Sequence, residues 1–202
     1  MPWSSRPAWT TRWWRPAPPA PPAPPPKVPP GPLPSTPPRL VALVTMFDST
    51  SAADIPPDAK MVAGYGDGAY KWTPADWARF PRARGVVIAT SAGYFTAIVL
   101  DVETGDARPQ QAPGWADGSR LTTGWVPTLY GTKATLDQCR PLVAAAGIDC
   151  DYWLADWTTV PHLPAGYGAC QFAAPGHGSP GHFDMSVVAS WWPRTVGTPR
   201  PL

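Results

Sequence analysis

The chain has 202 residues, of which 31 are proline, a share well above the ordinary one of about 5%. Its formal net charge of +2 divides unevenly: residues 1–39 carry five cations and no acid, and the rest carries the other 11 of the 16 cations and all 14 acids. This weakly acidic body argues against a nucleic-acid-binding protein, and no apolar run approaches the length of a membrane span.

Residues 1–39 are expected to form a disordered tail. Residues 18–38 are dominated by proline and alanine, which favours an extended polyproline II chain without a core. Arginine and tryptophan are interleaved ahead of it, in the segment Arg12-Trp13-Trp14-Arg15. Two interpretations stay open: a weak arm for an anionic wall or membrane surface, or a leader without function. No apolar region follows the early arginines, so we expect no secretory signal.

From residue 40 onward, short runs rich in Val, Ile, Tyr and Phe recur along the chain. Their continuous apolar character is typical of strands buried on both faces, as in a parallel sheet. The candidate strands are 40–48, 61–67, 85–91, 95–103, 126–131, 151–157, 169–173 and 183–188.

Helix signals lie between some of these strands. Thr73 is a suitable N-cap and Pro74 a suitable first helical residue. Residues 132–146 have apolar positions at helical spacing and stop at a glycine. A third helix over 109–120 is weakened by a proline–glycine pair near its start.

Strands alternating with few helices predict an α/β fold, a modified, helix-poor (β/α) TIM-like barrel over residues 40–193. Residues 194–202 are expected to be a short flexible end. The third and fourth candidate strands are almost contiguous, whereas a parallel crossover needs a dozen residues or more. The sequence therefore predicts either a tight hairpin there or one strand outside the barrel.

Cysteine and histidine give no clear metal or redox site. The three cysteines are expected to be isolated thiols, with a Cys139–Cys150 disulfide as the alternative. His177 and His182 flank a Gly/Ser/Pro loop, and we expect loop or supporting roles for them, with no metal and no cofactor.

Two acids close together carry the main chemical signal. Glu103, the only glutamate of the chain, follows Asp101 by two residues, so on a strand both side chains point to one face. Repulsion and partial burial then raise one pKa and leave a protonated acid beside a charged one. Such a pair can cleave a glycosidic bond. The alternative is that Asp101 ends a strand and Glu103 lies in a solvated loop.

Further acids are expected at the same place. Asp48 ends the first candidate strand and Asp184 lies in the last, and active sites of such barrels gather where strand ends converge. Aromatic rings suit the C–H faces of sugars, with core packing as the alternative for each. The candidate substrate-binding residues are Tyr65, Tyr130, Trp153, Asp156 and Trp157.

Five segments, taken in chain order, resemble those of glycoside hydrolase family 25, the muramidases (lysozymes) of bacteria and phages. They are Phe47-Asp48, Leu100–Glu103, Tyr152–Ala155, Gln171-Phe172 and Phe183–Val188. The similarity spans about residues 41–188 and is greatest to short actinobacterial or actinophage members. It implies a modified β/α barrel.

The resemblance also implies a mechanism. Glu103 is then the general acid that protonates the oxygen between N-acetylmuramic acid and N-acetylglucosamine. Asp101 stabilises the developing cation or orients the substrate's acetamide, and Asp48 and Asp184 set pKa values and hold substrate. A covalent and a substrate-assisted route both stay open.

The implied partner is peptidoglycan or a related glycan, cut by a monomer at the cell wall, after release from the host cytoplasm in the case of a phage protein. The loops after the second and third strands are shorter than is usual in the family. They motivate a second hypothesis, a catalytically weak or inactive glycan-binding module on a degenerate barrel. A metal-dependent amidase is a third.

Overall fold

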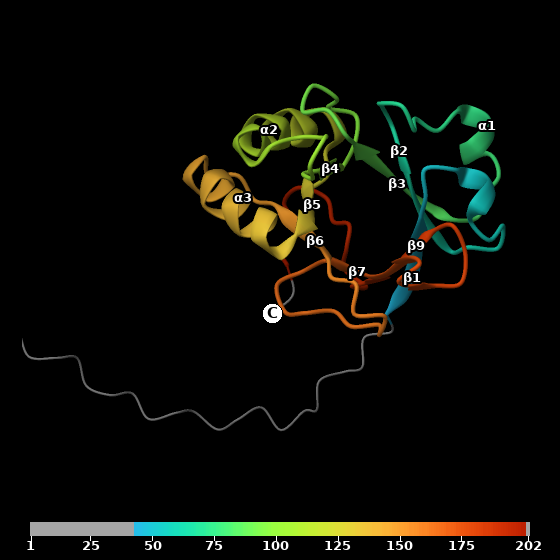
Figure 1. Ribbon diagram of the computed structural model, residues 1–202. Helices are drawn as coiled ribbons and strands as arrows, with labels where there is room; N and C mark the ends of the chain where they lie inside the picture. Colours follow the sequence, from blue (N-terminus) through green and yellow to red (C-terminus); the bar gives the residue numbers. More distant parts are fainter. Residues whose placement is uncertain (1–42, 201–202) are drawn as a thin grey trace, which may run out of the picture. The chain divides into compact units, whose positions relative to one another are not determined.

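The computed structural model describes residues 43–200 (Figure 1). The chain divides into two units, residues 1–39 and residues 40–202. The predictions for the first unit, its disorder and its surface-binding arm among them, lie outside the described residues.

Eight strands form a closed barrel (Figure 1). Neighbours pair in the order β1, β2, β3, β4, β5, β6, β7 and β9, and β9 pairs with β1 to close the ring. All eight candidate strands are present, which confirms the helix-poor barrel. The strands are β1 (Val44–Asp48), β2 (Met61–Tyr65), β3 (Arg84–Ala89), β4 (Val99–Asp101), β5 (Thr128–Thr132), β6 (Asp151–Ala155), β7 (Ala169–Pro175) and β9 (Asp184–Val188).

The last strand runs against the others. β9 is antiparallel to both β1 and β7, whereas each pair of consecutive strands from β1 to β7 is parallel. Its first residue, Asp184, therefore lies opposite Asp48, the last residue of β1. This reversal brings the beginning of β9 to the end of the barrel where the other strands finish, which we call the mouth. A two-residue strand, β8 (Gly178–Ser179), pairs only with β7 and was not predicted.

The link between β3 and β4 departs from both alternatives predicted for it. The two strands are parallel barrel neighbours, and residues 90–98 join them without a helix. The sequence placed the fourth strand too early, since pairing begins only at Val99. The loop is stabilised from outside: Trp115 Nε1 donates to the Tyr94 carbonyl at 2.9 Å, and Ser119 Oγ donates to the Ala97 carbonyl at 2.7 Å. Contacts with the next helix thus replace a crossover helix.

Three helices flank the barrel. α1 (Pro74–Trp77) is a single turn, begun by Thr73, which exchanges hydrogen bonds with Asp76 in a capping box. α2 (Ala112–Thr123) tolerates its proline because the residue lies in the first turn, where backbone donors have no helical partner. α3 (Lys133–Ala145) follows β5 directly. In Figure 1, α2 and α3 lie on the side of β4 to β6, and α1 lies beside β2 and β3. Two 3₁₀ turns cover Ala52–Asp54 and Pro109–Gln111.

The barrel is filled by side chains from alternate strand positions. One buried cluster unites inward residues of most strands, among them Met46, Val99, Trp153 and Val188. Trp153 is fully buried and donates from Nε1 to Ser186 Oγ at 2.9 Å. This layer separates the mouth from the opposite end of the barrel, which we call the floor.

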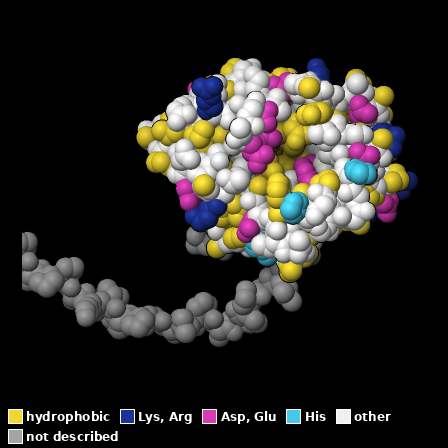
Figure 2. All heavy atoms as spheres, in the orientation of Figure 1, with side chains coloured by type: hydrophobic (Ala, Val, Ile, Leu, Met, Phe, Trp, Pro, Cys, Tyr) yellow, Lys and Arg dark blue, Asp and Glu magenta, His cyan; other side chains and the backbone are white. Residues whose placement is uncertain are grey.

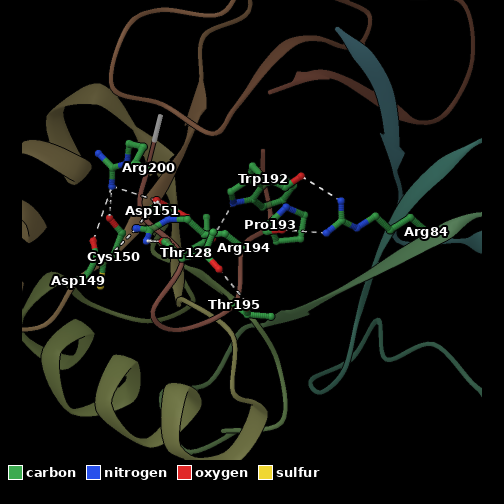
Figure 3. Close-up of polar contacts among 11 residues, drawn as sticks. Arg84, Thr128, Asp149, Cys150, Asp151, Trp192, Pro193, Arg194, Thr195 and Arg200 are labelled. Atoms are coloured by element: carbon green, nitrogen blue, oxygen red, sulfur yellow. Dashed lines mark hydrogen bonds and ion pairs between the residues drawn. The ribbon is translucent and has the colours of Figure 1, made fainter. Parts of the chain in front are cut away.

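The floor is closed by the segment after β9 (Figure 3). Arg194, whose side chain is 4% exposed, donates to both oxygens of Asp151 at the start of β6 and pairs with Asp149 at 2.7 Å. Arg200 adds a bond to Asp151 at 2.9 Å. Trp192 Nε1 donates to Thr128 Oγ1 at 2.9 Å. Arg194 and Arg200, from the segment predicted to be a short flexible end, are thus bonded to the start of β6.

The part of the chain that the structure describes contains no helix long and apolar enough to cross a membrane. Its three cysteines are buried and free. In the structure Cys139 and Cys150 do not form the alternative disulfide, and both belong to one buried cluster.

Candidate functional site

The alternation of side chains along each strand places the acids at the mouth. Met46 and Val99 point into the barrel, and two residues later, on the same face, come Asp48 and Asp101 at the ends of β1 and β4. Asp184 joins them because β9 starts where β1 ends. Three carboxyl groups from three strands thus share one end of the barrel.

Asp48 and Asp184 form the first pair of this cluster. Burial raises the pKa of Asp48 well above its ordinary value, and repulsion from Asp184 adds to it. Burial also raises the pKa of Asp184, to about 6, although a hydrogen bond with Asp48 acts in the opposite direction. Burial and mutual repulsion thus favour one shared proton on this pair, and Asp184, with a pKa of about 6, is mostly charged at pH 7.

Asp101 is the second buried acid. It is 4% exposed, and its Oδ1 is buried without a hydrogen-bond partner among the described residues. Burial, followed by repulsion from Glu103 and Asp106, raises its pKa to about 8. Asp101 is therefore neutral at pH 7, and its carboxyl group can donate a hydrogen bond to a ligand.

Glu103 lies just beyond β4 and not on it, because the strand ends at Asp101. The alternative prediction placed Glu103 in a solvated loop. The residue does lie in a loop, but its side chain is half-buried and not fully solvated. Its charge raises the pKa values of Asp101, Tyr130 and Asp184, which places it with the cluster. Burial, followed by repulsion from Asp106, raises the pKa of Glu103 itself.

A cavity adjoins Glu103 on the outer side of the mouth. It measures about 430 Å³ and lies between the loop after β4 and the first turns of α3, with Asp106, Arg108, Thr135 and Gln138 in its wall. Glu103 is therefore the one acid of the cluster that lines this cavity, since Asp48, Asp101 and Asp184 are not in its wall.

Two of the predicted aromatic residues face the acids, and one does not. Asp48, Asp101 and Asp184 all raise the pKa of Tyr65, after burial as the main cause, so this ring lies in their field. Tyr130 is inward at the end of β5, with its ring 4.8 Å from that of Trp153. Trp153 is fully buried, so the structure gives it the packing role and not contact with a ligand.

The last two predicted residues lie at the rim, beyond β6. Trp157 is 51% exposed and stacks on His177 with the ring centres 5.4 Å apart. Asp156 accepts from His162 Nε2 at 3.0 Å and is not among the groups that act on the acids of the mouth. The sequence analysis did not single out His162.

Gln171 is the residue of this site that sequence reasoning missed. It is 1% exposed, inward on β7, and bonded to Asp48, Tyr130 and Trp157. The sequence places it in the Gln171-Phe172 segment of the family pattern but assigns it no role of its own. A glutamine inside an otherwise apolar run, one strand away from predicted acids, is the signal that points to it.

The surface agrees with this arrangement. In Figure 2, acidic side chains gather near the centre of the face shown, beside an apolar hollow, whereas Lys and Arg lie toward the edge. Within residues 43–200, no group of three or more His, Cys, Asp or Glu residues is arranged to hold a metal ion. The chemistry that this mouth can perform is proton transfer and charge stabilisation by carboxyl groups.

The buried state of Asp101 predicts a pH effect on stability. Its pKa is about 8 in the folded protein and near 3.8 otherwise, so between these values the folded state binds more protons than the unfolded state. The free energy of unfolding should therefore fall as pH rises through this interval, by at most about 1.4 kcal/mol per pH unit from this group. Urea unfolding of the parent and of Asp101→Asn from pH 5 to 8 measures it. A parallel pH dependence of the two proteins would contradict the assignment.

Comparison with protein-family models gives no match, and comparison with curated proteins gives none either. Solved structures do resemble the chain. A muramidase from Acremonium alcalophilum is 15% identical, with 76% of this chain and 95% of that one covered and a TM-score of 0.49. A bacterial lysozyme from Streptomyces coelicolor is 18% identical, with 77% and 93% covered and a TM-score of 0.48. A family GH25 lysozyme from Aspergillus fumigatus is 16% identical, with 73% and 94% covered and a TM-score of 0.48.

Proposed function

We propose that the chain is a glycoside hydrolase of the muramidase type, which cleaves the β-1,4 bond between N-acetylmuramic acid and N-acetylglucosamine in peptidoglycan. The observation that carries the proposal is the gathering of Asp48, Asp101 and Asp184 at one end of the barrel, with Glu103 at its accessible edge. The substrate class comes from the resemblance of five segments to glycoside hydrolase family 25. The similar solved structures are named as a muramidase and a lysozyme, and we propose the same activity for this chain.

The proposed roles follow from access and protonation. Glu103 is the general acid, because it is half-buried, has a raised pKa and borders the cavity. Asp101, neutral up to a pKa of about 8, suits the second of its two implied roles, which is to orient the substrate's acetamide by a hydrogen bond. Asp184, with a pKa of about 6, is charged at pH 7 and stabilises the developing cation.

A sugar platform completes the proposal. Trp157 presents an exposed ring at the rim, and Tyr65 lies among the acids. Stacking of sugar rings on such surfaces holds a polymer across the mouth without using the acids for binding. Asp156 is proposed as a hydrogen-bonding partner beside Trp157.

Mass spectrometry of fragments released from purified peptidoglycan tests the proposed bond. New reducing ends should all be N-acetylmuramic acid. Reducing ends of N-acetylglucosamine would contradict the bond assignment. Cleavage between glycan and peptide, with no new reducing end and with loss of activity in a strong chelator, would favour the amidase hypothesis.

The second candidate is a glycan-binding module without catalysis. One feature of the structure favours it: the loop of residues 90–98 between β3 and β4 carries no helix, and the segment between β2 and β3 carries a single helical turn, α1. Under this hypothesis the protein sediments with peptidoglycan, and no reducing ends appear during long incubation.

A further inference from the structure

Gln171 connects three elements of the mouth through one side chain. It lies on β7, and its backbone pairs with Ala155 on β6 and Ser186 on β9. Because it is 1% exposed, its amide group has to find hydrogen-bond partners inside the protein.

The partners fix the orientation of the amide group. Oε1 accepts from Tyr130 Oη at 2.9 Å and from Trp157 Nε1 at 2.7 Å. An indole nitrogen can only donate, so the atom facing Trp157 has to be the oxygen of the amide. Nε2 is then directed at Asp48 Oδ2, 3.3 Å away. The glutamine thus has one arrangement, with its donor on the acid.

Asp48 depends on this donor, because its other neighbours act against its charge. Asp184 on β9 and Asp101 on β4 both raise its pKa, and Gln171 lowers it. Tyr65 on β2 and Tyr130 on β5 complete the surroundings, and both lie in the field of the acids. Among the described groups that act on Asp48, no cation opposes the repulsion.

We propose that Gln171 is a positioning residue that holds Asp48 in one orientation at the mouth and couples it to Trp157 at the rim. The proposal rests on the proposed function for its catalytic meaning. A sugar ring that stacks on the exposed face of Trp157 contacts an indole whose Nε1 donates a hydrogen bond to Gln171. Binding at the rim is thereby transmitted to the buried pair Asp48–Asp184 over two hydrogen bonds.

Gln171→Met tests the proposal, because methionine keeps the length of the side chain and removes both hydrogen-bonding ends. Two measurements are made: the titration of the Asp48 carboxyl carbon by NMR, and kcat and KM against pH on peptidoglycan. We expect Asp48 to titrate at higher pH, because its one favourable donor is gone. We also expect kcat to fall by about tenfold or more, with KM changed less.

Ser186→Ala is the matched control. Ser186 is equally buried and pairs with Gln171 across the sheet, but its hydroxyl accepts from Trp153 and not from a group that contacts Asp48. It should leave the Asp48 titration where it is in the parent. Gln171→Glu is the conservative variant: its protonated acid can still donate to Asp48, so its activity should approach that of the parent at low pH and disappear as the new acid ionises.

The proposal is overturned if Gln171→Met leaves the Asp48 titration and the pH profile like those of Ser186→Ala. Should Gln171→Met not fold, Trp157→Phe and Tyr130→Phe each remove one donor to Oε1, and each should move the titration in the same direction by less. An unmoved titration in both would also overturn it. The NMR measurement needs no turnover, so a protein that releases no reducing ends but shows the shift refutes the proposed function and not the positioning role.

Discussion

Glu103→Gln is expected to lower the rate of glycan cleavage by roughly 10²- to 10⁴-fold, the contribution of a positioned general acid. Glutamine keeps the shape of the side chain and cannot give up a proton to the leaving oxygen. Because burial raises the pKa of Glu103, its charge is not needed for folding. The melting temperature should therefore stay close to that of the parent, and affinity for peptidoglycan should persist.

Asp137→Asn provides the matched control for this experiment. Asp137 is an exposed acid on α3 that pairs with Lys133 at 2.6 Å, so its substitution removes one negative charge near the mouth without touching the cluster. Reducing ends released per minute should match the parent in this control. If Glu103→Gln released them as fast as Asp137→Asn does, Glu103 would not be the general acid.

Arg194→Met is expected to lower the free energy of unfolding by about 3–5 kcal/mol, the usual cost of breaking a buried ion pair from one side. The Asp151 side chain is fully buried, and without Arg194 only Arg200 opposes its charge there. Burial already raises the pKa of Asp151 despite both arginines, and the loss of one raises it further. The folded variant then binds a proton more readily than the unfolded chain, so its deficit should grow as pH rises. Urea unfolding at several pH values measures this.

Two further variants distinguish the loss of this buried ion pair from the effect of removing any arginine side chain. Arg120→Met breaks an exposed pair with Asp117 and should cost no more than about 1 kcal/mol. The double substitution Arg194→Met with Asp151→Leu removes the stranded carboxylate and should recover much of the loss. If the double variant were less stable than Arg194→Met alone, the floor would owe its stability to something other than charge pairing.

The barrel could be predicted because each strand corresponds to a short apolar run in the sequence, and polar residues or glycines mark where the run ends. Met61–Tyr65 and Asp151–Ala155 begin where the sequence placed them, since buried parallel strands are continuous apolar segments. The link from β3 to β4 was misjudged because apolar residues such as Phe95 extend the pattern of the fourth strand forward. That ring contacts Gly118 of α2 instead, a tertiary contact that no local pattern records.

The acids of the site were predictable for the same reason, since position in a strand sets both face and end. What the sequence could not supply was the direction of β9 and the partners of Gln171. Direction depends on the length and path of the chain before Asp184, and hydrogen bonds between β7, β5 and the rim join residues far apart in sequence. Trp153 was predicted to bind substrate because tryptophan stacks well on sugars. The alternation of side chains along β6 instead directs it into the core, where it is fully buried.

The antiparallel direction of β9 also determines where a surface or a fused partner can be attached to the barrel. Val44, where β1 begins, pairs with Val188, where β9 ends, so the barrel is entered and left at the floor. A partner fused directly before β1, in place of residues 1–42, or after the floor segment is therefore joined at the end of the barrel opposite the acids. Immobilised in this way, the protein should still meet an insoluble polymer as large as a wall fragment.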